Sequence, residues 1–356
     1  MRLYEEGRPR LGRFRRLHTG KVITSMLNRK SAGEWCRGGI RLSGPLLCES
    51  VGGAEVIEGL GRVAAVCRET LGGGPRIRRP LAEGSSLDIV EITCCDDRRS
   101  FRPPVLVSGP KAGVTRMLLV RSGGFLARVN GREEFTDPVT GFVLRQGDEV
   151  AFAHPAHTRD ISTMLDLGLD VYGDVCGDLL PPAQNPVVPV TAALDLAHRR
   201  LVSACRAGID GFEVAERVHH LLTTVPTPHT PARTGRRAAT VQAHRRLVDH
   251  TRAVLIDGPL TVSLEELGRQ VGCSPFHLSR VFHQVTGQTL NRYRNQLRVR
   301  AVAEDLAGGH SSLRTLAATY GFADQAHLTR VFRQHTGQVP SAVRAMLRPA
   351  GPGERI

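Results

Sequence analysis

The chain has 356 residues, which is enough to bury two separate cores, so we expect two domains joined by linkers. Its net charge of +14 rests on 48 basic residues, and all but three of these are arginines. The eight cysteines contain no Cys-x-x-Cys pair, which excludes a disulfide framework and a zinc ribbon as organising features. No apolar run of about 18 residues occurs, so we expect a cytoplasmic protein without a membrane span.

The positive charge is concentrated at the two ends of the chain. Residues 1–84 carry a net charge of +8, residues 85–239 carry −1, and residues 240–348 carry +7. A neutral middle beside a basic block is typical of a sensor joined to a domain that binds a polyanion. Arginines that are merely solvated at the surface would give the same totals. The motifs must therefore decide between a polyanion-binding domain and an ordinary charged surface.

Residues 1–84 are predicted to be a largely disordered extension. They are rich in Gly and Arg, and only Val56 to Leu71 has the apolar spacing of a helix. The alternative is that the true start of the protein lies downstream of this segment.

Segments of alternating polarity begin at Leu87 and predict a small β-barrel or sandwich within residues 85–180. Strands are expected over 87–93, 116–121 and 124–130, and the pair Asn130-Gly131 is a hairpin signal.

Two helical stripes follow, over 192–207 and 211–223, and predict a helical hairpin within residues 190–223. This hairpin is expected either to pack on the barrel or to pair with a second subunit in a homodimer. Residues 224–240 are rich in proline and are predicted to be a linker.

Residues 241–347 are predicted to be an all-helical domain with well-marked helix ends. A capping box from Ser263 to Glu266 marks the start of a helix expected over 264–271. Ser274 then caps a second helix, expected over 275–286. A helix, a Gly-containing turn and a second helix are the plan of a helix-turn-helix unit.

The second of these helices is repeated further along the chain. The stretch His277 to Gln288 returns as His327 to Gln338, and a long helix over 290–307 joins the two copies. Elements expected over 312–320 and 324–336 rebuild the helix-turn-helix plan. Two similar helices predict two copies of one binding unit. Duplex DNA offers equivalent surfaces in successive turns of its major groove.

Each repeated helix has an apolar side that predicts core packing and an opposite side with Arg and short polar residues. Arg suits a major groove because it can bind O6 and N7 of guanine with two hydrogen bonds. A helical bundle with solvated arginines is the alternative, and the duplication of a capped unit argues against it. The expected core residues are Leu278, Val281, Phe282 and Val285 with Leu328, Val331 and Phe332.

The order of these elements over residues 243–347 resembles the AraC-type transcription regulators. The most specific match runs from Gly321-Phe322 through His327-Leu-Thr-Arg-Val-Phe332 to Thr336-Gly337 and Pro340. The resemblance implies double-stranded DNA as a partner, and RNA polymerase as a second one if the chain is an activator. Carried over by position, it places these residues at the DNA: Phe276, Ser279 and Arg280 in one groove segment, and Gln325, Thr329 and Arg330 in the next.

The segment from Leu119 to His157 resembles the cupin-like effector domain that precedes such DNA-binding domains. The matching pieces are Asn130-Gly-Arg132, Asp137-Pro138, Gly147-Asp148 and the strand end at Phe152. The resemblance implies a β-barrel and a small-molecule effector. We expect no metal, because the His-x-His pair of cupin metal sites is missing. Asp160 and Asp166 could complete a site, but nothing in their spacing demands it. His154 and His157 are expected at a surface turn, and Cys94 is expected to pack within a strand.

We therefore predict an α+β multidomain fold, with a cupin-like β-barrel and a helical hairpin before an all-α domain with two helix-turn-helix units. The predicted function is sequence-specific transcription regulation, without a cofactor. No Gly-x-Ser-x-Gly, P-loop or His-Glu-x-x-His motif occurs, so we expect no enzyme. A cupin-type metal-dependent enzyme or a small-molecule-binding protein is the alternative. Because the two repeated helices differ in detail, the predicted DNA site is asymmetric, with two groove segments about 34 Å apart.

Overall fold

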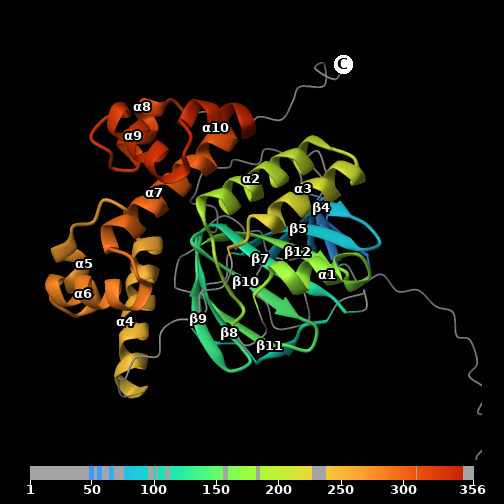
Figure 1. Cartoon of the computed structure of the whole chain (residues 1–356), viewed down its shortest axis with the longest axis horizontal. Coiled ribbons are helices and arrows are strands. Elements are labelled where there is room, and N and C mark those ends of the chain that lie inside the picture. Colours follow the sequence, from blue (N-terminus) through green and yellow to red (C-terminus); the bar gives the residue numbers. More distant parts are fainter. Residues whose placement is uncertain are drawn as a thin grey trace, which may run out of the picture. The chain divides into compact units, whose positions relative to one another are not determined.

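The computed structural model describes residues 48–51, 54–57, 64–67, 76–94, 100–101, 103–108, 113–154, 159–181, 185–226, 238–309 and 311–347. A β-rich part with three helices comes first in the chain, and an all-helical part follows (Figure 1). The expected α+β organisation is confirmed. No helix among these residues has the length and the hydropathy that a membrane span requires.

The β-rich part consists of two antiparallel sheets. The larger sheet has the strand order β1-β2-β3-β4-β5-β12-β7-β10-β13, and the smaller sheet has the order β6-β11-β8-β9. The strands are β1 Cys48–Val51, β2 Ala54–Ile57, β3 Ala64–Cys67, β4 Arg76–Glu83, β5 Leu87–Cys94, β6 Val105–Leu106, β7 Thr115–Ser122, β8 Phe125–Val129, β9 Arg132–Thr136, β10 Thr140–Arg145, β11 Glu149–Ala153, β12 Asp160–Leu167 and β13 Val187–Pro189.

Both faces of the larger sheet are covered. On β7, Met117 and Leu119 pack in a core shared with the helices of the β-rich part. Leu118 and Val120 point the other way, into a core shared with the smaller sheet. A strand that is buried on both faces needs apolar residues at nearly every position, which explains the continuous apolar run of β7.

Three helices cover one face of the larger sheet: α1 Leu169–Leu179, α2 Ala192–Ala207 and α3 Gly211–Thr223 (Figure 1). The predicted hairpin of α2 and α3 therefore packs on the sheet of its own chain. Helix α1 was not predicted, because it buries only Tyr172 and Cys176. Leu169 and Val171 are exposed, so α1 lacks a clear apolar stripe.

The sheet begins earlier than the sequence indicates. Strand β4 pairs with β5 along its length, so residues 76–83 belong to the sheet and not to a disordered extension. The expected helix over 56–71 is wrong, because β2 and β3 are paired strands there. A short apolar run is compatible with both the helical and the strand periodicity. Pairing at the edge of the sheet favours the strand here. Strand β1 pairs with β2, and the other residues before Arg76 lie outside the described residues.

The helical part has two cores that share helix α7. The first core joins α4, α5, α6 and the start of α7, and the second joins the rest of α7 with α8, α9 and α10. Residues 238–240, expected in the linker, are already helical. The helices are α4 Ala238–Asp257, α5 Leu264–Val271, α6 Pro275–Thr286, α7 Leu290–Gly308, α8 Leu313–Thr319, α9 Gln325–Thr336 and α10 Pro340–Leu347.

Candidate nucleic-acid interface

Side-chain caps fix the start of α6 and α9, the second helices of the two helix-turn-helix units. The Ser274 hydroxyl accepts a hydrogen bond from the backbone N–H of His277 at 3.3 Å. The Asp324 carboxylate accepts one from the backbone N–H of His327 at 2.7 Å. Gly follows the last residue of each helix with a positive φ, which other residues rarely adopt. The two helices therefore start and stop at matching points of the repeat.

The inner sides of α6 and α9 are buried as the sequence predicts, except at Val285. This residue lies in the last turn of α6, was expected in the core and is 37% exposed. Leu278 and Leu328 are both fully buried, as are Phe282 and Phe332. The Phe282 ring packs against the ring of Tyr293 on α7, with 5.2 Å between their centres. Helices α6 and α9 are thus each held by a core of their own, and α7 links the two cores.

The six residues assigned to DNA contact lie on or beside the outer sides of α6 and α9. Arg280, Gln325 and Arg330 are exposed, and Ser279 and Thr329 are half-buried. The sixth, a phenylalanine at position 276, is 77% exposed. That much apolar surface at a helix start suits contact with a thymine methyl group. The DNA role of these residues stays a prediction.

A shallow groove follows the outer side of α9. It is lined by three of the predicted residues, Gln325, Thr329 and Arg330, and also by Arg333 and Gln334. The hydroxyl of Thr329 donates to the backbone carbonyl of Gln325 at 2.9 Å, so toward a partner its oxygen can act only as an acceptor. The groove therefore combines two arginines with two amide side chains, a set that can bind both phosphates and base edges.

Several other arginines of the helical part are engaged within the protein. Arg298 donates to the carbonyl of Leu260 through two nitrogens, at 2.7 and 3.0 Å. Burial, together with the nearby Arg294, lowers the pKa of Arg298 to about 10. Arg344 donates to the carbonyl of Ser311. Sequence reasoning could not separate these structural arginines from Arg280 and Arg330, which lie at the surface.

The connector helix α7 also binds the β-rich part. Glu304 accepts hydrogen bonds from Arg121 of β7 at 2.7 Å and from Arg199 of α2. Burial alone would raise the pKa of Glu304, but the two arginines outweigh it and lower the pKa. This carboxylate therefore stays charged and joins the helix between the two DNA-binding units to the larger sheet.

A second carboxylate, that of Asp137 at the end of β9, also joins the two parts, and this one is fully buried. It accepts hydrogen bonds from Nε of Arg252 on α4 at 2.9 Å and from the hydroxyl of Tyr293 on α7. Asp137 was noted in the sequence only as part of the cupin-like resemblance, and the structure gives it this bridging role.

A cavity of about 630 Å³ lies between the two sheets. Apolar side chains from both sheets line it, among them Leu118 and Phe125. Arg116 and Asp166 also line it and form an ion pair with 2.6 Å between Nε and a carboxylate oxygen. The cavity is thus mostly apolar with a few fixed polar groups, which is the usual character of a small-molecule site.

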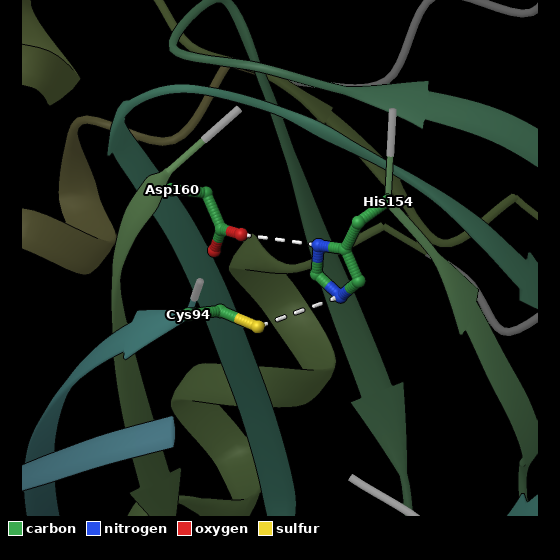
Figure 2. Close-up of side chains that lie close together, drawn as sticks. All are labelled: Cys94, His154 and Asp160. Carbon is green, nitrogen blue, oxygen red and sulfur yellow. Dashed lines mark hydrogen bonds and ion pairs between the residues drawn. The ribbon is translucent and has the colours of Figure 1, made fainter. Parts of the chain in front are cut away.

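Cys94, His154 and Asp160 meet at the wall of this cavity (Figure 2). The Cys94 sulfur lies 3.7 Å from Nε2 of His154, and an Asp160 oxygen lies 3.1 Å from Nδ1. Burial would lower the pKa of His154, but contacts with Asp160 and Cys94 raise it to about 9. The expected surface position of His154 is wrong, since its side chain is 5% exposed. Cys94 packs in a strand as predicted, and His157 lies outside the described residues.

Comparison with known proteins identifies the helical part. Residues 267–346 match a family model described as a helix-turn-helix domain. The chain is 39% identical over 72 residues to the bifunctional transcriptional activator and DNA repair enzyme Ada of Escherichia coli. It is 33% identical over 70 residues to the multiple antibiotic resistance protein MarA of Salmonella typhimurium. These matches cover 20% of this chain, 20% of Ada and 54% of MarA.

Solved structures were also compared. One is a transcriptional regulator with an AraC-type DNA-binding domain from Chromobacterium violaceum, which is 22% identical with a TM-score of 0.29. The alignment covers 32% of this chain and 99% of the regulator. ToxT from Vibrio cholerae is 9% identical, with a TM-score of 0.30, and covers 75% of this chain and 100% of its own. The sequence matches, together with the two capped units, confirm the AraC-type resemblance of the C-terminal helix-turn-helix domain.

Proposed function

We propose that this chain is a sequence-specific, DNA-binding transcription regulator of the AraC type whose β-rich part binds a small-molecule effector. The observation that carries the proposal is the pair of capped helix-turn-helix units on one connector helix, α7. With 19 residues, α7 is roughly 28 Å long, so one subunit can place α6 and α9 in adjacent major-groove segments.

The cavity supports the effector part of the proposal, because strand β7 both lines the cavity and contacts the helical part. On β7, Arg116 lines the cavity, and Arg121 binds Glu304 of α7. On β5, Val90 and Ile92 line the cavity. A ligand that shifts these strands would therefore act on the ion pairs that hold α7. A homodimer, a contact with RNA polymerase and a cytoplasmic location stay predictions.

The direct test is selection of bound sequences from a random DNA library by the full-length protein. We expect enrichment of one asymmetric motif with two blocks of specified bases. The double variant Arg280→Ala/Arg330→Ala should lose this enrichment. The control Arg269→Ala should keep it, because that exposed residue lies on α5 and pairs with Glu266.

Two results would count against the proposal. The first is a library that emerges unenriched at low salt, where phosphate contacts are strongest. The second is turnover of a small molecule by a protein that selects no DNA sequence, which would favour the metal-dependent cupin enzyme.

A further inference from the structure

Three side chains that commonly bind metals come together from two sheets. Cys94 ends β5 and Asp160 begins β12, and the two residues are direct partners across these neighbouring strands. His154 follows β11 of the smaller sheet and points toward them (Figure 2). One sulfur, one ring nitrogen and one carboxylate oxygen lie within 4.8 Å of one another, and all three residues are buried.

Two polar atoms of this cluster lack proper hydrogen bonds. Within the described part of the chain, neither Nδ1 of His154 nor Oδ1 of Asp160 has a hydrogen-bond partner, although the two atoms are 3.1 Å apart. The two atoms form a buried ion pair with each other that lacks the geometry of a hydrogen bond. An ion bound between these side chains would take one donor atom from each residue.

The spacing of the donor atoms suits a small tetrahedral ion. Donor atoms bound to one zinc ion at its usual bond lengths lie about 3.3–3.6 Å apart. Here the Cys94 sulfur is 3.7 Å from Nε2 of His154, and Nδ1 of His154 is 3.1 Å from Oδ1 of Asp160. A small rotation of the imidazole ring would direct one nitrogen to the point between the sulfur and the carboxylate.

We propose that Cys94, His154 and Asp160 bind one divalent transition-metal ion of the zinc class. A set of one sulfur, one nitrogen and one oxygen fits a borderline ion, whereas magnesium and calcium take oxygen ligands. On binding, the Cys94 thiol and the protonated His154 ring each release a proton to solvent, and no electron is transferred.

Three protein ligands leave a fourth position on a tetrahedral ion, and this position faces the cavity. All three residues are among those that line it, next to the ring of Phe125, which lies 5.7 Å from the ring of His154. Water or a donor atom of a small molecule would occupy the fourth position. This last step rests on the proposed role of the cavity as an effector site, whereas the ion site does not.

The test uses Co²⁺, which replaces Zn²⁺ and absorbs visible light. The full-length protein is freed of metal with a chelator and titrated with Co²⁺ while its absorption spectrum is recorded. We expect about one equivalent to bind, with a thiolate-to-metal charge-transfer band and the strong visible bands of a four-coordinate ion. Zn²⁺ should abolish this spectrum by displacement. Absence of these bands in the folded wild-type protein would overturn the proposal.

Variants assign the site. Cys94→Ser should remove the charge-transfer band, and Asp160→Asn should weaken Co²⁺ binding by roughly tenfold or more. Cys273→Ser, which changes the half-buried cysteine at the start of the first DNA-binding unit, should leave the spectrum unchanged. Asp166→Asn is the carboxylate control, because Asp166 lines the same cavity outside the cluster. A charge-transfer band that survives Cys94→Ser would place the ion elsewhere and refute the assignment.

The ion site and the proposed function fail in different ways. Co²⁺ binding without selection of any DNA motif would support the ion site and contradict the regulator. Selection of a motif by a protein that binds no Co²⁺ would do the reverse.

Discussion

Arg280 and Arg330 hold matching positions on the two repeated helices, yet their surroundings differ. Arg280 lies 3.3 Å from Nδ1 of His277, whereas Arg330 lies in the groove that also contains Gln325 and Arg333. The residues around the two arginines differ as well, with an exposed Phe276 on α6 where α9 has Ala326. At the residue scale, the two helices are therefore expected to read different bases.

Replacing Arg330 with Ala should weaken binding to the selected DNA site by about 1–3 kcal/mol, because a bidentate contact with guanine is lost. Binding to unrelated DNA should weaken much less. Competition titrations at fixed salt would measure both. An equal loss on selected and unrelated DNA would show that Arg330 contacts only phosphate.

A second prediction concerns Asp249 on α4. Burial raises its pKa to about 7; Arg252 opposes the shift, and Glu134 and Asp137 add to it. Since the pKa is higher in the folded protein than in the unfolded one, this carboxyl favours folding at low pH. That contribution is lost as the pH rises from about 4 to about 7.

Asp249→Asn should remove this dependence. The stability of the variant relative to the wild type is expected to increase by roughly 1–2 kcal/mol between about pH 5 and about pH 8. Urea unfolding at the two pH values would measure it. A constant difference between the two proteins would show that Asp249 is already ionised at pH 5.

At the scale of elements, α5 to α9 could be predicted to within about one residue at each end, whereas α4 begins within the predicted linker. Ser263, Ser274 and Ser312 each cap a helix where the sequence indicates a start. Helix α1 could not be predicted, because it buries only two residues and carries little periodicity. Strands β1 to β4 could not be predicted, because they form by pairing at one end of the larger sheet. Local caps are readable in a sequence, whereas pairing at a sheet edge depends on distant residues.

The cap at Ser274 gives a prediction at this scale. Ser274→Ala should destabilise the helical part by about 1 kcal/mol, because the backbone N–H of His277 loses its acceptor. Ser274→Asp keeps an acceptor and should cost little. Thermal unfolding of the three proteins would test this. Equal losses in both variants would mean that the hydroxyl acts in some way other than capping.

The cluster of Cys94, His154 and Asp160 shows why a site can be invisible in a sequence. Its members come from β5, the end of β11 and the start of β12, and only the pairing of β5 with β12 brings two of them together. The spacing of His154 and Asp160 along the chain resembles no metal motif. By contrast, the six DNA-contact residues lie on two repeated helices, where local spacing and family resemblance were enough to nominate them.

At the scale of the whole described molecule, ion pairs connect the β-rich part and the helical part. Glu304 of α7 is shared by Arg121 and Arg199, whose side chains are both 2% exposed. Each arginine has one further carboxylate partner, Glu91 or Asp195. Charges held in this way are costly to leave unpaired, so the contact is sensitive to any shift of the strands.

Glu304→Gln should therefore destabilise the protein by about 1–3 kcal/mol, since two buried arginines lose a charged partner. The matched control is Glu213→Gln, which breaks a surface pair with Arg217 and should cost less than about 1 kcal/mol. Urea unfolding would compare them. If the two variants lose the same stability, the contact between the parts is no stronger than a surface ion pair.

The central claim is that one chain reads two adjacent major-groove segments with α6 and α9. Methylation-interference footprinting on a selected DNA site tests it most directly. The predicted result is two contacted segments about one helical turn apart, with Arg280→Ala erasing one and Arg330→Ala erasing the other. A single contacted segment, or two variants that erase the same segment, would contradict the claim.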